Sequence, residues 1–141
     1  MRLWIDTEYN GFKGALISMA LIDEDGREWY EVLKCRSPSP WVAKHVMPKL
    51  HKQPVTRGAM RKSLYGFLNV YEDVHIVADW PQDIQHFCDL LIVSQGLRIN
   101  LPPLTMEIRQ DIDARKSLTP HNALADARAL RIADLGVPKV S

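Results

Sequence analysis

The sequence lacks the features that would place it in a membrane, a secretory pathway or a disordered tail. Its uninterrupted apolar runs, such as residues 15–17 and 76–78, are far too short to cross a bilayer, and the N-terminus has no signal-peptide pattern. There is no low-complexity tract and no linker rich in glycine, proline and serine. We therefore expect one soluble, cytoplasmic domain over residues 1–141, with no membrane partner.

Cysteine is also scarce. Cys35 and Cys88 are the two cysteines, and neither lies in a CxxC motif or in a mixed Cys/His spacing typical of metal ligands. We predict that both are reduced thiols and that Cys88 fills part of the core.

Acidic residues are absent from residues 32–71, although both flanking regions are net acidic. This segment has eight Lys and Arg residues, whereas acids outnumber bases by seven to three before it and by ten to seven after it. A basic segment between acidic flanks indicates a polyanionic partner held near a carboxylate cluster. The alternative is that these charges cover a solvated pair of helices.

Hydrophobic periodicity and turn residues predict a mixed α/β domain. Strands are expected at 2–6, 14–23, 27–34, 74–78 and 104–110, and helices at 41–47, 56–71, 80–95 and 121–135. The turn at residues 24–26 makes the second and third strands antiparallel, and the later strands alternate with helices as in parallel crossovers. The most economical arrangement is a three-layer α/β/α sandwich with a mixed central sheet.

Two carboxylates stand at the end of the first apolar strand, in LWIDTEYNGF. Residues i and i+2 of a strand point to the same face, so Asp6 and Glu8 converge if the strand continues that far. Their charges repel, and a hard divalent cation such as Mg²⁺ or Mn²⁺ between them would make the pair favourable. If the strand ends at Asp6, the pair merely begins a polar loop through Asn10 and Gly11.

A further acid is misplaced on the last helix. Asp126 lies three or four residues from Ala123 and Leu130, which puts it on the apolar, inward face. A carboxylate directed towards a core is unfavourable unless it is paired or binds a metal. A metal ion or a salt bridge to a buried arginine would each explain Asp126.

His121 precedes the same helix. It lies about 140° around an ideal helix from Asp126, so we place it at the helix start or in the preceding loop. A histidine that reaches across an open site from there suits a general base acting on water. The alternative is a surface histidine without a catalytic role.

The segment after the fourth predicted strand has two acids one helical turn apart. Asp79 is suited to cap the next helix, with Pro81 in its first turn. Asp83 shares its face and has no capping role. We favour Asp83 for chemistry and keep Asp79 as the competing assignment. A further pair, Asp111 and Asp113, lies among basic residues and is interpreted as a solvated loop or a salt-bridged strand end.

Taken in order, WIDTE, ADWPQD and HNALADAR resemble the motifs of the histidine-bearing DEDD (DEDDh) family of 3′-5′ exonucleases, which includes ribonuclease T, oligoribonuclease and small exoribonucleases. The resemblance spans Asp6 to Asp126 and implies a ribonuclease H-like fold. ADWPQD departs from the family pattern and leaves Asp79 and Asp83 open. Aligning the helix DIQHFCDLL with that of the family favours Asp83.

The resemblance implies a metal-dependent exoribonuclease that acts on the 3′ ends of single-stranded RNA and releases nucleoside 5′-monophosphates. Asp6, Glu8 and Asp126 would hold two Mg²⁺ or Mn²⁺ ions, Asp83 would support the second ion, and His121 would be the general base. Because ribonuclease T and oligoribonuclease are dimers, a homodimer is also implied.

Substrate contacts are expected at two places. Tyr9 and Phe12 lie where the family holds the terminal nucleotide, and Arg57 and Arg61 belong to the basic segment that would track phosphates. The alternatives are a DNA exonuclease of the same chemistry and a non-catalytic nucleic-acid-binding module. The set of four acids and a histidine argues against the second alternative, because binding alone would not require all five.

Overall fold

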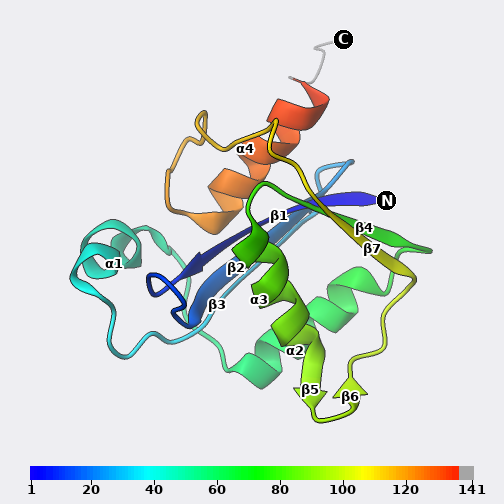
Figure 1. Cartoon of the computed structure of the whole chain (residues 1–141), viewed down its shortest axis with the longest axis horizontal. Helices are drawn as coiled ribbons and strands as arrows, with labels where there is room; N and C mark the ends of the chain where they lie inside the picture. The colour runs from blue at the N-terminus through cyan, green and yellow to red at the C-terminus, as the bar shows by residue number, and fades with distance from the viewer. Residues whose placement is uncertain (137–141) are drawn as a thin grey trace.

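A five-stranded sheet forms the centre of the computed structural model, which describes residues 1–136 (Figure 1). Residues 137–141 of the predicted domain lie outside the described residues. The strands are β1 (Arg2–Tyr9), β2 (Leu16–Asp23), β3 (Glu28–Val32), β4 (Val74–Ala78) and β7 (Leu104–Ile108), in the spatial order β3-β2-β1-β4-β7. β1, β2 and β3 pair antiparallel, whereas β4 is parallel to both β1 and β7. The prediction of a mixed sheet is therefore confirmed.

Helices cover both faces of this sheet. They are α1 (Pro40–His45), the 3₁₀ helix η1 (Met47–Lys49), α2 (Arg57–Leu68), α3 (Pro81–Leu91) and α4 (Ala123–Leu135). In Figure 1, α4 lies against one face, while α2 and α3 lie against the other. This confirms the predicted three-layer α/β/α sandwich, and the strand order is that of a ribonuclease H-like α/β fold.

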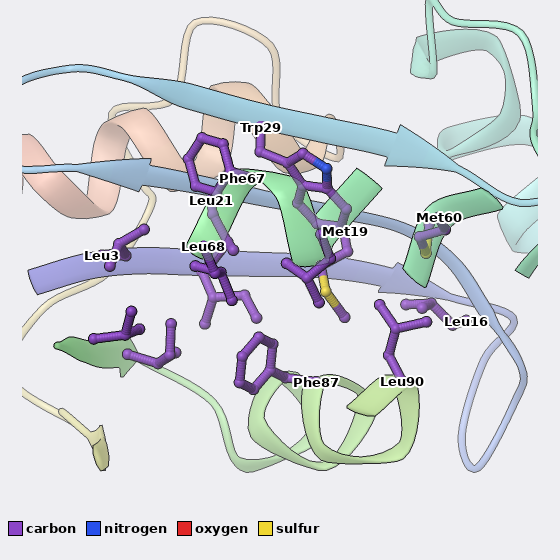
Figure 2. Packing of buried hydrophobic residues seen from close by; sticks show 14 of the residues in the cluster. Leu3, Leu16, Met19, Leu21, Trp29, Met60, Phe67, Leu68, Phe87 and Leu90 are labelled. Atoms are coloured by element: carbon purple, nitrogen blue, oxygen red, sulfur yellow. The ribbon is translucent and has the colours of Figure 1, made fainter. Parts of the chain in front are cut away.

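The alternation of side chains along β1 explains this layering. Leu3 and Ile5 point into the cluster formed with α2 and α3, whereas Trp4 points into the cluster under α4. Figure 2 shows the first cluster, where Phe87 and Leu90 of α3 face the sheet. β2 is buried along its whole length because helices cover both of its faces.

Two local predictions were wrong. The helix expected at 80–95 ends at Leu91, and the chain continues into a small hairpin of β5 (Ile92–Ser94) and β6 (Leu97–Arg98), whose turn contains Gly96 with a positive φ of 73°. The helix expected at 41–47 ends at His45, and Pro48 lies inside η1 rather than ending a helix. Hairpin and short-turn boundaries depend on local packing, which periodicity does not report.

Two simpler expectations concern thiols and membranes. Both cysteines are free, and Cys88 is only partly buried, so it does not belong to a core cluster. None of the helices within residues 1–136 has the length and apolar character needed to cross a bilayer.

Candidate active site

β1 extends through Glu8, so the interpretation of this segment as the start of a polar loop is wrong. Asp6 and Glu8 follow Trp4 on the face covered by α4. Asp6 is opposite Ala20 of β2, and a register shift occurs immediately after Glu8. The strand therefore delivers both carboxylates to one face at its carboxyl end.

Asp126 reaches these two acids from the first turn of α4. Two small residues, Ala123 and Ala127, are fully buried and let this helix approach the sheet closely. Asn122 fixes the helix start, because its side chain accepts a 2.9 Å hydrogen bond from the backbone N–H of Ala125 and donates a 2.8 Å bond to the carbonyl of Lys49. Carboxylate oxygens of Asp6, Glu8 and Asp126 lie within 4.8 Å of one another.

A second acidic group forms where β4 gives way to α3. Oxygens of Asp6, Asp79 and Asp83 also lie within 4.8 Å of one another. Asp83 is only 3% exposed and accepts a 2.6 Å hydrogen bond from the Thr7 hydroxyl. Thr7 points to the α3 side of β1, where it binds Asp83, whereas Asp6 points to the α4 side. Two successive residues of this strand therefore position carboxylates on both sides of the sheet edge.

The predicted helix cap at Asp79 is wrong. The N-cap of α3 is Trp80, and no side chain makes a capping hydrogen bond there. The helix begins one residue too late for Asp79 to act as its cap. Helix capping therefore does not account for Asp79, and both Asp79 and Asp83 lie beside Asp6.

Burial and mutual repulsion act together on these carboxylates. Desolvation is the largest effect: it raises the pKa of Glu8 to about 8 and that of Asp83 to about 7, although the hydrogen bond from Thr7 opposes the rise at Asp83. Burial, followed by the charges of Asp83 and Glu8, raises the pKa of Asp6 well above its ordinary value. Burial likewise raises the pKa values of Asp79 and Asp126. In the absence of a bound cation, the fold therefore makes the ionised form of these acids unfavourable.

The residues present fit a divalent cation. Within residues 1–136, none of these five acids forms a salt bridge, so the buried arginine considered for Asp126 is not found. Oδ2 of Asp6 is buried and has no hydrogen-bond partner in this described part of the chain. Such an oxygen is costly unless a ligand satisfies it, and an all-oxygen set suits a hard cation such as Mg²⁺ or Mn²⁺. Asp6 belongs to both acidic groups, so it would be shared by two ions.

His121 lies in the loop that leads into α4, with a positive φ of 69°. A backbone hydrogen bond from His121 and the charge of its side chain both oppose the rise that burial causes in the pKa of Asp126. The ring stands edge-on to Trp41 at a centroid distance of 5.1 Å, and Trp41 packs on His45 at 4.7 Å. Helix α1 therefore supplies an aromatic support for the loop histidine, which sequence periodicity did not indicate.

A hollow of about 360 Å³ opens beside Glu8, and Tyr9, Phe12, Trp41 and Gln82 are among its lining residues. The Tyr9 hydroxyl donates a 2.7 Å hydrogen bond to the side-chain oxygen of Gln82. Phe12 is 87% exposed, so its ring is free to contact a ligand. The two predicted nucleotide-contacting residues thus lie together next to the acids.

The two predicted phosphate contacts are placed differently. Arg57 is exposed at the start of α2 and lines a hollow that adjoins the one beside Glu8. Arg61 donates hydrogen bonds of 2.8 and 3.1 Å to the carbonyls of Leu90 and Ile92, at the end of α3 opposite to Asp83. The structure therefore brings Arg57, but not Arg61, towards the acids.

Sequence reasoning missed two supporting residues. Thr7 contacts Asp83 across 76 positions, and its place between two acids gave no sign of this partner. Asn10 was assigned only to a loop. Its side chain donates to the carbonyl of Ser37 and accepts from the N–H of Ser39, and so joins the loop bearing Phe12 to the start of α1. A polar residue after a strand was the available signal for Asn10.

Comparison with known proteins places the chain in a family. No family model matches it. It is 32% identical over 148 aligned positions to the 3′-5′ exoribonuclease Rv2179c of Mycobacterium tuberculosis, and equally to the corresponding 3′-5′ exoribonuclease of a second strain of that organism. These alignments cover 91% of this chain and 88% of each relative. The chain belongs to the family of these 3′-5′ exoribonucleases.

Proposed function

We propose that this chain, acting as a single domain, is a 3′-5′ exoribonuclease that depends on two divalent cations, Mg²⁺ or Mn²⁺. The observation that carries the proposal is the pair of acidic groups that share Asp6, one completed by Glu8 and Asp126 and the other by Asp83 with Asp79 nearby. The relatives' exoribonuclease activity supports the choice of RNA over DNA. A binding module would gain nothing from five clustered acids that form no salt bridge within residues 1–136.

The acids would bind the two cations as two overlapping sets of ligands. Asp6, Glu8 and Asp126 would hold one cation, while Asp6 and Asp83 would hold the other. Two cations, when bound, stabilise the attacking and leaving oxygens of a phosphodiester displacement. The hydrogen bond from Thr7 fixes the Asp83 carboxylate, so its position does not depend on a bound ion.

His121 would take the proton from the attacking water. Its loop position beside the acids lets the imidazole approach from outside the sheet, and contact with Trp41 limits its orientations. Nucleoside 5′-monophosphates would leave from the 3′ end. Replacing His121 with Ala should lower kcat by about 100-fold or more, with little change in KM. If the loss of kcat/KM came instead from a higher KM, His121 would be assigned to substrate binding.

A direct test uses 5′-labelled single-stranded RNA, single-stranded DNA and duplexes, each with Mg²⁺, Mn²⁺ or EDTA. The expected result is a ladder shortened from the 3′ end of single-stranded RNA, absent in EDTA and in Asp6→Ala. A ladder on DNA alone would establish the DNA exonuclease alternative. Intact substrates in every lane would overturn the enzyme proposal.

The middle acid needs its own comparison. We expect Asp83→Ala to lose more activity than Asp79→Ala, because Asp83 is more deeply buried and is held by Thr7. An inactive Asp79 variant beside an active Asp83 variant would reverse the assignment. The homodimer implied by the resemblance stays a prediction, which sedimentation of the purified chain would test.

A further inference from the structure

Three adjoining hollows run from the acids towards the start of α2. The site hollow lies beside Glu8, and it shares Phe12 and Gln82 with a middle hollow of about 690 Å³. The middle hollow in turn shares Ala15, Leu16 and Arg57 with an outer hollow of about 500 Å³. The shared walls make one continuous path across the surface.

The charge along this path changes sign. Glu8 is the one acidic residue that lines its inner end, whereas Lys13 and Arg57 line the middle hollow and Lys34 and Arg36 line the outer one. All four cations are exposed, and none of them forms a salt bridge with any of residues 1–136. Asp89 is the one acid among the lining residues of these two hollows. A row of unpaired cations complements the backbone of a nucleic acid.

Surfaces for bases lie along the same path. Phe12 projects into solvent between the site hollow and the middle hollow, with the Lys13 ammonium 5.4 Å from its ring centroid. The Tyr9 ring packs on His86, another residue of the middle hollow, at 5.0 Å. Exposed aromatic faces beside cations bind successive bases of a single strand without reading their sequence.

The outer hollow is built on a fixed frame rather than on a free loop. Leu33 and Val55 form a parallel bridge, in which the Val55 N–H donates a 2.7 Å hydrogen bond to the Val32 carbonyl. The Leu33 N–H donates a further 2.7 Å bond to the Ile17 carbonyl of β2. The segment before α2 is thereby held beside the end of β3, where Lys34 follows. The first turn of α2 carries no acid, so nothing there offsets the positive helix start.

We infer that the three hollows form a track for the 5′ portion of a single RNA strand whose 3′ end lies at the acids. This inference rests on the proposed function and extends it to the substrate class. The preferred substrate is an oligoribonucleotide long enough to reach Lys34 and Arg36, rather than a dinucleotide or a small phosphodiester. Phosphates would follow the cations while bases contact Phe12 and its neighbours.

Length dependence tests the track. We would measure kcat/KM for a ribodinucleotide and for an oligoribonucleotide of about eight nucleotides. The variant Lys34→Gln/Arg36→Gln removes the outer cations, and Arg98→Gln/Lys116→Gln removes the same charge from residues outside the three hollows. We expect the first variant to lose about fivefold or more on the longer substrate, a smaller loss on the dinucleotide, and a flatter salt dependence. Equal losses on both substrates, or an equal loss in the Arg98/Lys116 variant, would overturn the track.

Binding separates this inference from the proposed function. Fluorescence anisotropy in EDTA measures the affinity for labelled single-stranded RNA without any turnover. Binding that weakens in Lys34→Gln/Arg36→Gln, in a protein that hydrolyses nothing, would refute the exonuclease and support the track. Binding insensitive to these residues, or tighter binding of a duplex or an acidic peptide at the same charge, would refute the track whatever the activity.

Discussion

Two groups of carboxylates in this molecule use the same residue types in opposite ways. The first is the active-site group around Asp6, which forms no salt bridge within the described chain. The second lies after β7 and on α4, where Asp111 and Asp134 both pair with Arg109, at 2.6 and 2.8 Å, and Asp113 pairs with Arg115 at 2.8 Å. We call this second set the arginine-paired group. The sequence left a solvated loop or a salt-bridged strand end open for Asp111 and Asp113; both residues lie in the loop after β7, and both are salt-bridged there.

The two groups differ in protonation as well as in pairing. Hydrogen bonds from arginine lower the pKa of Asp111 and of Asp113, whereas burial raises the pKa of Glu8 and of Asp83. Both groups contain an acid-x-acid motif, so spacing does not separate them. What separates them is whether the fold supplies a cation from its own side chains or leaves the position open to a metal.

The largest contrast should appear in activity. Asp6→Ala is expected to reduce kcat by about 1,000-fold or more, because both ions would lose a ligand. Asp111→Ala, which also removes one carboxylate, should leave RNA hydrolysis within about twofold, since its partner is a surface arginine. Matched turnover assays under saturating Mg²⁺ would decide the matter. Similar losses in the two variants would remove the distinction between the groups.

Metal binding should stabilise the protein through the active-site group alone. At about 100 times its dissociation constant, Mg²⁺ or Mn²⁺ should raise the free energy of unfolding by about 2.7 kcal/mol. The increase should vanish in Asp6→Asn and persist in Asp111→Asn. Urea unfolding with and without the cation would measure this increase in the free energy of unfolding for each variant. A cation effect that survives in Asp6→Asn would place the binding site elsewhere.

The two groups should also give opposite pH dependences without metal. The native pKa of Glu8, about 8, lies above its unfolded value, so the native state binds the extra proton between about pH 4.5 and 8. Stability should therefore fall as the pH rises through this range, with a slope of up to about 1.4 kcal/mol per unit.

Glu8→Gln should flatten this slope. For Asp111 and Asp113, whose pKa values are lowered, stability depends on pH in the opposite direction. Their contribution to the stability of the fold is present above about pH 4 and is lost in acid. Denaturant titrations at several pH values in EDTA would measure both effects. A slope near neutrality that is unchanged in Glu8→Gln would contradict the assignment.

The smallest effect is expected at the edge of the arginine-paired group. Asp113→Asn removes an exposed pair with Arg115, and it should leave the melting temperature within about 2 °C of that of the unchanged protein. Thermal unfolding at two salt concentrations would check this value. A larger loss would mean that the pair of Asp113 with Arg115 stabilises the fold more than an exposed ion pair normally does.

Much of the site followed from local patterns. An apolar strand that ends in Asp6-x-Glu8 and an acid on the apolar face of the last helix were both visible in the residue order, and the structure brings these residues together. The roles of these residues stay predictions. The capping role of Asp79 was wrong because a helix start can shift by one residue without any change in periodicity.

Other features depended on contacts between distant segments. Trp41 lies beside His121 only because α1 folds back against the loop before α4, and Arg61 turns to the carbonyls of Leu90 and Ile92 because α3 ends there. No local pattern reports such contacts, since the partners are separated by 29 to 80 residues.

By itself, the sequence determined the layers of the fold and the carboxylates available for chemistry, because side-chain periodicity and residue type are local properties. Only the tertiary structure decided which acids stay unpaired, since that depends on where arginine side chains from other elements end. It pairs Asp111 with Arg109 and leaves Asp6 with a buried oxygen that has no partner in residues 1–136. The tertiary structure also aligned the cations from Lys13 to Arg57 into one path that leads to those acids.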